Sequence, residues 1–361
     1  MKFVLFYHSL LSDWNHGNAH FLRGICSELI ARGHGVEIYE PSDAWSYSNL
    51  VSECGEAALN DFHDFYPGLE SRRYRLEELD FDAALAGADL VIAHEWNDPR
   101  LIAELGNRRA ESRSFKLLFH DTHHRGVTAP WEMERYDFRH FDGVLAFGEV
   151  LREIYLKNAW CGRAWTWHEA ADTKVFHPLP ERAKQRDLIW IGNWGDDERT
   201  QELNEFLIRP VAQLGLSASV HGVRYPGEVR ERLRKAGVEY RGWLPNFRVP
   251  EVYSEARFTV HIPRRPYTER MHGIPTIRPF EALACGIPLV SAPWNDVEGL
   301  FTAGEDYLVA SSGAEMQRHL RTLKADADYA AALARHGLET IRARHTCAHR
   351  VDELLSLFRS L

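Results

Sequence analysis

The chain has 361 residues, a length that accommodates two α/β domains of ordinary size. Hydrophobic residues make up 45% and charged residues 26%, which is the balance of a soluble globular protein. A net charge of −9 argues against a broad nucleic-acid-binding surface, so we expect no nucleic-acid partner, although local basic patches could still bind phosphate.

The cysteine and hydropathy patterns predict a cytoplasmic protein. Five cysteines are scattered along the chain without a C-x-x-C pair, which favours reduced thiols over a disulfide framework. The apolar start, residues 1–8, is short and is followed by no small-residue cleavage site, so we interpret it as a strand rather than a signal peptide. No apolar run reaches the length of a transmembrane helix, which leaves peripheral contact as the membrane association to consider.

The chain opens with a β-loop-α-β pattern. Residues 3–7 are a candidate buried strand, residues 12–18 a loop, and residues 19–32 a helix whose apolar side chains recur at helical spacing. A Gly-His-Gly turn then precedes an alternating strand over residues 36–39. Such a unit pairs its strands in parallel through a right-handed crossover.

The same alternation continues through the first half of the chain. Residues 43–75 are aromatic and weakly periodic, and we assign them no elements. The other elements predicted here are strands 89–94, 115–119 and 142–147, a helix over 99–107, and a helix that ends at Lys157.

A second series follows residues 178–187, which have the prolines and mixed charge typical of a linker. Alternating strands and helices favour parallel sheets covered on both faces. The sequence therefore predicts two doubly wound, Rossmann-like α/β domains, residues 1–177 and 178–345, whose carboxyl strand ends face an interdomain cleft. The predicted elements of this half are strands 188–192, 218–221, 238–240, 258–261 and 289–291 and helices 250–256 and 349–361.

The most informative segment covers residues 273–291. Pro275 and Pro279 interrupt any preceding helix, and Pro279 suits the first position of a new helix because its missing N–H would be unpaired there. Glu281 would then lie in the first turn, next to unpaired N–H groups that form a natural anion seat. The alternative is a glutamate that only complements the helix dipole, which contributes about 0.3–1 kcal/mol.

The end of this segment is equally regular. Residues 280–285 are strong helix formers, and Gly286 suits the C-terminal end of the helix. Residues 287–291 then have the composition of a short buried strand.

Residues 281–290, E-A-L-A-C-G-I-P-L-V, resemble a segment of GT-B glycosyltransferases, particularly family 4 and the related CgeB-like group. In that family the glutamate, here Glu281, holds the ribose of a nucleotide-sugar, and the N-terminus of the same helix faces the diphosphate. The resemblance also implies a GT-B fold in which the last segment, residues 346–361, packs back on the first domain.

One position departs from the family pattern. Many members have a second acidic residue eight positions before the glutamate, and this chain has Gly273 there. We expect the backbone of the following loop to make the donor-sugar contact instead. That loop consists of Gly273, Ile274, Pro275 and Thr276.

The first half contains one catalytic candidate. His120 follows a buried strand and resembles the F-H strand end of family-4 enzymes, where the histidine meets the donor sugar and supports developing positive charge. A hydrogen-bonded structural histidine is the alternative, and a metal site formed with His123 and His124 is the weaker one. The glycine of the first loop, Gly17, matches the position that approaches the donor phosphate, and residues 168–178 resemble the interdomain segment of the family.

The first strand of the second half ends in further donor-site candidates. In similar enzymes a basic residue follows the glycine that is here Gly192, and another comes seven positions after that glycine, both on the diphosphate. This chain has Asn193, a departure, and Arg199 at those positions. Arg199 could equally pair with Asp196 or Glu202 on the surface.

Other loops bordering the anion seat supply more arginines. Arg264, Arg265 and especially Arg278 are candidates, because a guanidinium fork suits phosphate oxygens. Trp243 and Leu244 lie in the turn whose main chain receives the nucleotide base in similar enzymes, and Trp243 could stack on that base or belong to the core.

These features predict a glycosyltransferase of glycan biosynthesis. Its donor would be a UDP-, GDP- or dTDP-sugar, and its acceptor a glycan, lipid or small molecule. By resemblance it retains anomeric configuration and needs neither a metal ion nor a cofactor. A sugar-nucleotide epimerase and an inactive GT-B binding or assembly protein are the alternatives, although an epimerase would need cleft carboxylates and no convincing pair is visible in the sequence.

Overall fold

The computed structural model describes residues 1–180 and 183–361, and its contacts divide the chain into two compact units. Unit 1 comprises residues 1–169 and 347–361, and unit 2 comprises residues 170–346. The sequence placed the boundary later, at residue 177. Ala171 pairs with Thr346 in an isolated parallel bridge, so unit 2 begins and ends side by side.

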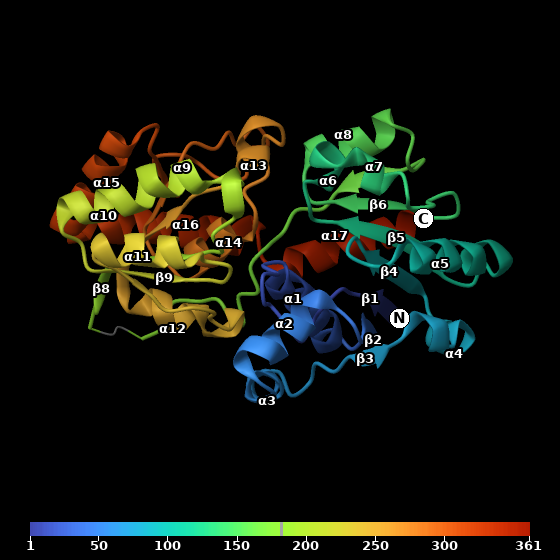
Figure 1. Ribbon diagram of the computed structural model, residues 1–361. Coiled ribbons are helices and arrows are strands. Elements are labelled where there is room, and N and C mark those ends of the chain that lie inside the picture. The colour runs from blue at the N-terminus through green and yellow to red at the C-terminus, as the bar shows by residue number, and fades with distance from the viewer. Residues whose placement is uncertain (181–182) are drawn as a thin grey trace. The chain divides into compact units, whose positions relative to one another are not determined.

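Unit 1 is built on a seven-stranded parallel sheet with the order β3-β2-β1-β4-β5-β6-β7 (Figure 1). The strand order reverses between β1 and β4, which creates a topological switch point. The central strand β4 is buried along its whole length, as expected for a parallel strand covered by helices on both faces. The strands are β1 Lys2–Phe6, β2 Gly35–Pro41, β3 Arg72–Tyr74, β4 Leu90–His94, β5 Lys116–Asp121, β6 Gly143–Ala146 and β7 Ala164–Thr166.

The helices of unit 1 include the C-terminal helix. α17 packs against α1, where Arg32 donates to Asp352 at 2.5 Å and to the Ala348 carbonyl at 3.0 Å. The region left unassigned in the sequence holds α2, α3 and β3. The helical segments are α1 Ala19–Ala31, α2 Trp45–Cys54, α3 Ala57–Phe65, η1 Leu76–Glu78, α4 Phe81–Leu85, α5 Pro99–Glu111, α6 Arg125–Thr128, α7 Pro130–Met133, α8 Glu149–Lys157 and α17 Cys347–Ser360.

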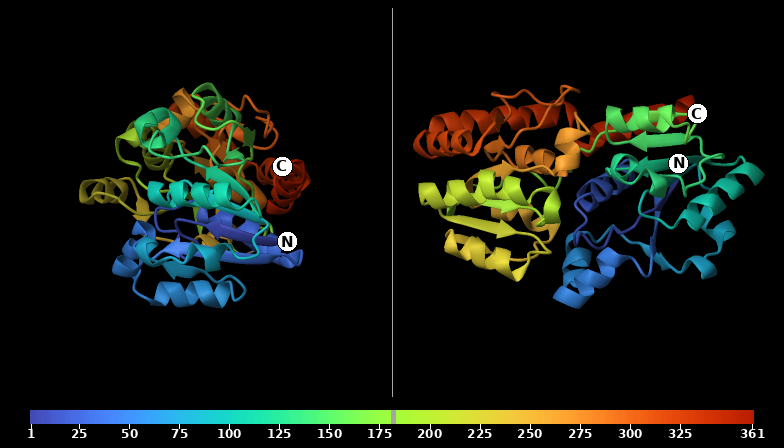
Figure 2. Two further views of the ribbon diagram at one scale, coloured as in Figure 1. Left: turned by 90° about the vertical axis from the view of Figure 1, so that its right-hand side faces the viewer. Right: turned by 45° about the horizontal axis from the view of Figure 1, so that its top comes forward.

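Unit 2 has a six-stranded parallel sheet with the order β10-β9-β8-β11-β12-β13, and Figure 2 shows its helices on both sides of the strands. The sequence predicted five of these strands and missed β13, which has two residues. The predicted linker also includes residues 181–182, which lie outside the described residues, and its last two residues already belong to β8. The strands are β8 Arg186–Ile191, β9 Ala218–His221, β10 Val238–Tyr240, β11 Ala256–His261, β12 Leu289–Ser291 and β13 Leu308–Val309.

The helical segments of unit 2 cover this sheet, and the last of them ends at Arg344, two residues before unit 2 ends. They are η2 Asp196–Glu198, α9 Thr200–Leu203, η3 Asn204–Ile208, α10 Arg209–Leu214, α11 Gly227–Lys235, η4 Asn246–Arg248, α12 Val249–Ser254, α13 Arg265–Glu269, α14 Ile277–Ala284, α15 Gly313–Ala325 and α16 Ala327–Arg344. Among the described residues, no helix is both long and apolar enough to cross a membrane.

Helix α14 starts earlier than the sequence predicted. Its first residue is Ile277, so Pro279 is the third residue rather than the first. The first four N–H groups of any helix lack intrahelical acceptors, so a proline in the third position loses no hydrogen bond either. Glu281 therefore lies beyond the first turn, and its predicted position beside the unpaired N–H groups is wrong.

The C-terminal end of α14 agrees with the sequence. Gly286 has φ +65°, and its N–H donates to the Leu283 carbonyl at 3.1 Å, while the N–H of Ile287 donates to the Ala282 carbonyl at 3.3 Å. This pair of bonds is the Schellman arrangement, which favours glycine because L side chains rarely adopt a left-handed conformation.

Candidate functional site

Glu281 is the polar centre of the predicted donor site in unit 2. Its side chain is completely buried, and its carboxylate accepts hydrogen bonds from Asn246 Nδ2 at 2.7 Å and from Arg278 Nη1. Asn246 begins the short turn η4, directly after the predicted base-binding turn. The glutamate thus ties the start of α14 to the loop that follows β10.

The backbone before α14 is unusual at Thr276. This residue precedes the helix with φ +60° and ψ 178°, a combination that only glycine adopts readily. A β-branched residue in this region stores about 1–3 kcal/mol of strain, and such strain is concentrated at functional sites. Arg278 follows two residues later, with 27% of its side chain exposed.

The loop of Gly273 and Ile274 does not offer the free N–H groups that the sequence suggested. The N–H of Gly273 donates to the Asn295 carbonyl at 2.8 Å, and that of Ile274 donates to the Met271 carbonyl at 3.4 Å. Pro275 has no N–H. The expectation that this loop supplies free backbone donors is therefore wrong for Gly273, Ile274 and Pro275.

A carboxylate that the sequence did not single out lies over Gly273. A Cβ added to Gly273, whose φ is +91°, would lie 2.7 Å from Oε1 of Glu298. Glu298 is half-buried in the loop after β12. An acidic group therefore occupies the space in which a longer side chain at position 273 would start.

Arg199 has a different environment from the predicted one. Its guanidinium donates to the Ile262 carbonyl at 3.1 Å and to the carbonyl of Asn193, and it pairs with neither Asp196 nor Glu202. Its hydrogen bonds join the loops after β8 and β11. This geometry favours a role in holding the two loops together over a role as the main diphosphate ligand.

Three arginines nevertheless gather in this region. Burial, with repulsion from Arg264 and Arg278, lowers the pKa of Arg199 to about 9, which leaves it charged at neutral pH. Arg264 pairs with Glu198 at 2.7 Å and has 27% of its side chain exposed. Arg265 contacts the Glu198 carbonyl at 3.2 Å. Because Arg264 and Arg278 repel Arg199, an anion between these guanidinium groups would be stabilised.

The remaining candidates of unit 2 lie in tightly packed turns. Gly192 is buried between Trp190 and the loop after β9, and Oδ1 of Asn193 accepts from the N–H of Val223 at 2.9 Å. Asn193 therefore joins two loops, which is a different role from that of a basic residue. Trp243 and Leu244 are half-buried after β10, which leaves part of each side chain accessible.

His120 is the penultimate residue of β5 in unit 1 and is only 1% exposed. Its ring lies against Trp167, with ring centroids 4.9 Å apart, and against Phe21 at 5.8 Å. Burial lowers the pKa of His120 to about 3, so the ring is neutral. Its Nε2 has no hydrogen-bond partner among the described residues, so the alternative of a hydrogen-bonded structural histidine is not supported at this atom.

Three more histidines extend from His120 in a row of buried rings. Neighbouring ring centroids are 5.4 Å apart from His120 to His94, 5.9 Å from His94 to His16, and 5.7 Å from His16 to His8. Burial lowers the pKa of all four imidazoles, so the row is uncharged. Gly17 comes directly after His16 in the chain, in the loop before α1.

The ends of β4 and β5 hold a carboxyl pair that the sequence analysis missed. Glu95 and Asp121 are both fully buried and hydrogen-bond to each other. Burial and mutual repulsion raise the pKa of Glu95 well above its ordinary value, and burial raises that of Asp121. Arg125 donates to Glu95 Oε2 at 3.1 Å, and the hydroxyl of Tyr155 donates to Asp121 at 2.7 Å. These contacts fix the loop after β5.

His123 and His124 do not join His120 in a metal site. His124 Nδ1 lies 2.9 Å from the hydroxyl of Thr128, and the two histidine rings lie against each other. Throughout residues 1–180 and 183–361, no group of three or more His, Cys, Asp or Glu side chains is arranged to hold a metal ion.

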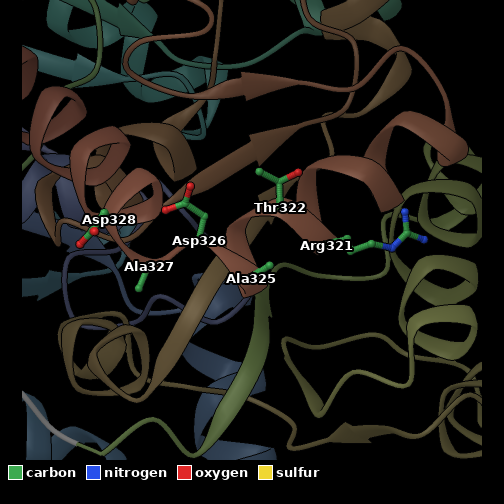
Figure 3. A pocket seen from close by; sticks show the side chains of 6 residues that line it. All are labelled: Arg321, Thr322, Ala325, Asp326, Ala327 and Asp328. Atoms are coloured by element: carbon green, nitrogen blue, oxygen red, sulfur yellow. The ribbon is translucent and has the colours of Figure 1, made fainter.

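Unit 2 also has a cavity of about 550 Å³ at the turn between α15 and α16 (Figure 3). Arg321 and Asp328 lie at opposite ends of this turn in the figure, and Asp326 accepts from the Tyr329 N–H at 2.9 Å as a helix cap. The polar groups do not converge, so this cavity is not a candidate site.

Comparisons with known proteins agree with the architecture. Residues 199–356 match the family described as Glycosyl transferase-like. A search of curated proteins finds no match. Among solved structures, sucrose-phosphate synthase from Thermosynechococcus elongatus is similar with a TM-score of 0.69 and 16% identity, covering 100% of this chain and 98% of that one.

Two further structures cover the chain equally well. Anabaena HepE in complex with UDP and glucose gives a TM-score of 0.68 and 14% identity, with 100% of each chain covered. T4 phage BGT in complex with UDP and Mn²⁺ gives a TM-score of 0.62 and 13% identity, with 100% and 99% covered. The chain has the GT-B fold. Its two units are the parallel-sheet, Rossmann-like domains of that fold, as the sequence predicted.

Proposed function

We propose that this protein is a glycosyltransferase that moves a sugar from a nucleotide-sugar donor to an acceptor. The observation that carries the proposal is the gathering of Arg199, Arg264 and Arg278 around the start of α14, within the segment that matches the Glycosyl transferase-like family. Two negative charges on a diphosphate would relieve the mutual repulsion of these guanidinium groups. Arg264 and Arg278, which are partly exposed, are the proposed ligands, and Arg199 supports the loops around them.

The donor base and the acceptor are further parts of the proposal. HepE was solved with UDP, and UDP is therefore the first nucleotide to test. Glu281 remains the predicted ribose contact. The hydrogen bonds from Asn246 and Arg278 hold its carboxylate in place.

Glu298 takes the role that the sequence could not assign. In the proposal its carboxylate, which lies over Gly273, accepts hydrogen bonds from the donor sugar in place of the missing acidic residue at position 273. A Glu298→Gln variant is then expected to keep UDP affinity and to lose activity by about tenfold or more, since only the sugar contact is weakened.

The proposed chemistry depends on positioning and electrostatics. With retention of configuration, the acceptor oxygen attacks the anomeric carbon on the face from which the diphosphate leaves, and the departing phosphate oxygen takes the acceptor's proton. The neutral ring of His120 is the proposed contact for the transferred sugar. Metal independence and a place in cytoplasmic glycan biosynthesis remain predictions, and activity in the presence of excess EDTA tests the first.

The experiment that tests the function begins with nucleotide binding. Thermal unfolding is measured with millimolar UDP, GDP, dTDP and uridine, because a ligand that binds only the folded chain raises its melting temperature. We expect at least one nucleoside diphosphate to stabilise the protein and uridine to have no effect. The function is wrong if no diphosphate and no nucleotide-sugar stabilises it.

Product analysis then separates the possible reactions of a bound nucleotide-sugar. Incubation with donor and candidate acceptors is expected to release nucleoside diphosphate and form a glycoside, and His120→Ala is expected to lose this activity while keeping UDP binding. An epimerised nucleotide-sugar formed from donor alone would instead identify an epimerase. Unchanged activity in the His120→Ala variant would remove this residue from the mechanism.

A further inference from the structure

Unit 1 contains a cavity of about 600 Å³ at the carboxyl ends of four neighbouring strands, β3, β2, β1 and β4. His8, two residues after β1, and Trp96, two residues after β4, both line it. The strand order reverses between β1 and β4, so the cavity lies at the switch point where open parallel sheets bind ligands. Its volume is within the roughly 300–1,000 Å³ of small-molecule sites.

Aromatic side chains form much of the wall of this cavity. The rings of Trp45 and Trp96 are nearly perpendicular, at 82°, with centroids 6.2 Å apart, and the ring of His8 lies against Trp45 at 4.7 Å. Both tryptophans are half-buried, so part of each ring remains accessible. The negative face of an indole attracts polarised C–H groups, which line the apolar faces of a sugar ring.

The charged residues of the cavity cancel one another or are acidic. Arg100 pairs with Asp98 at 2.8 Å and with Glu77 at 3.3 Å, and all three line the cavity. The other arginine of the lining, Arg75, lies 3.8 Å from Glu78. The lining therefore has three carboxylates, which belong to Asp43, Glu77 and Asp98, and only these two guanidinium groups. This excess of negative charge disfavours a phosphate or any other anion in the cavity.

Two groups remain that suit an uncharged, hydroxyl-rich ligand. Asp43 lines the cavity, is exposed, and forms no ion pair with any cation in the described part of the chain. Its carboxylate can accept bonds from ligand hydroxyls. His8 adds no charge, because burial lowers its pKa to about 4.

We propose that this cavity, which we call the tryptophan cavity, binds an uncharged sugar through the rings of Trp45 and Trp96 and the carboxylate of Asp43. In the reaction proposed above this sugar would be the acceptor, and that assignment rests on the proposed function. Binding of the sugar itself does not depend on it. The arginines of unit 2 would then bind an anion, and the tryptophan cavity would bind an uncharged ligand.

The test measures sugar binding to the full chain by saturation-transfer NMR and calorimetry. The probes are methyl α-glucopyranoside, methyl N-acetylglucosaminide and maltose, with glucose 6-phosphate as the anionic counterpart. We expect at least one neutral probe to bind and glucose 6-phosphate to bind more weakly than methyl α-glucopyranoside. Trp96→Ala is expected to weaken binding by about threefold to tenfold, the magnitude of one aromatic contact.

Matched variants keep the test decisive. Trp131, which is 63% exposed on α7 and does not line the cavity, gives the control Trp131→Ala, which should bind like the wild type. Trp45 contacts Trp14 and His8, so its replacement could disturb folding. Asp43→Asn changes an exposed residue without that risk and is also expected to weaken binding.

Three results would overturn the tryptophan cavity. They are the absence of binding by every neutral probe, binding of glucose 6-phosphate alone, and equal weakening by Trp131→Ala and Trp96→Ala. UDP is titrated into the same samples to keep the two proposals apart. Stabilisation by UDP without sugar binding would reject the cavity alone, whereas sugar binding without any nucleotide effect would reject the transferase and leave the cavity standing.

Discussion

The two sheets share one architecture, yet their carboxyl edges differ in charge. The edge of unit 1 has neutral imidazoles, tryptophans and a buried carboxyl pair whose pKa values are raised. The buried guanidinium of Arg23 donates its hydrogen bonds to backbone carbonyls and to Asp13. The edge of unit 2 gathers three guanidinium groups, of which Arg264 and Arg278 each pair with a glutamate while both repel Arg199. The comparison teaches that a Rossmann-like sheet fixes only where a ligand binds, while the side chains of its loops decide the charge of that ligand.

The largest expected effect tests whether the cations of unit 1 are structural. Arg23 on α1 is fully buried, donates to the Leu10 and Leu11 carbonyls at 2.8 and 3.0 Å, and pairs with Asp13 at 2.9 Å. Arg23→Ala leaves that carboxylate without its cation and should lower the free energy of unfolding by about 3–5 kcal/mol in urea titrations. Arg32→Ala, directly after the same helix and partly exposed, should cost about 1 kcal/mol or less. Equal losses would contradict the structural role.

The next effect concerns the cations of unit 2. Arg278→Ala is expected to weaken UDP binding by about tenfold to a hundredfold in calorimetry, because a charged hydrogen bond contributes about 1.5–3 kcal/mol. Arg278→Lys keeps the charge next to the buried Glu281 and should give an intermediate value. Arg234→Ala, 72% exposed on α11, is the control and should bind as wild type. If Arg234→Ala weakened UDP binding as much, a general charge effect would replace a specific site.

Much of the fold could be predicted from the sequence, and the reasons why the rest could not are physical. Long buried strands such as β4 and the glycine that ends α14 have strong local signals. The start of α14 was misplaced because a proline is equally acceptable at the third position of a helix. The carbonyl partners of Arg199 could not be predicted because they come from the loops after β8 and β11, which only the fold brings together.

The carboxyl pair of unit 1 shows which signal went unused. Strand β4 ends at His94 and is followed by Glu95, β5 ends in His120 and Asp121, and the register pairs His94 with His120. Parallel register then places Glu95 beside Asp121. Two neighbouring strands that end in the same kind of dipeptide could therefore have indicated the pair, whereas the short elements of residues 43–75 carried no comparable pattern.

A smaller effect tests the strained residue at the edge of unit 2. Replacing Thr276 with glycine should remove about 1–3 kcal/mol of strain at φ +60° and lose about 0.5–1 kcal/mol through chain entropy. We expect a net stabilisation of about 1 kcal/mol in urea titrations. The same change at Thr268, within α13, relieves no strain and should destabilise the chain. Destabilisation of similar size at both positions would show that Thr276 is not strained.

The smallest effect is a pH dependence that belongs to unit 1. Because burial raises the pKa of Glu95 and of Asp121, the folded chain binds more protons than the unfolded chain above about pH 4, so the pair's stability contribution falls as pH rises. Asp121→Asn removes one titrating group and should flatten this fall above about pH 4. Asp137→Asn is the control, since the lowered pKa of Asp137 keeps it ionised in that range. An unchanged slope in the Asp121→Asn variant would contradict the raised pKa of Asp121.

Hydrogen exchange with UDP tests most directly whether the anionic ligand binds at the carboxyl edge of unit 2 and not at that of unit 1. Amide exchange is followed by mass spectrometry with and without saturating UDP. The account predicts slowed exchange in the segment from Ile262 to Glu281 and at Glu298, with no change in the segment from Asp43 to Arg100. Protection by UDP confined to the segment from Asp43 to Arg100 would contradict it.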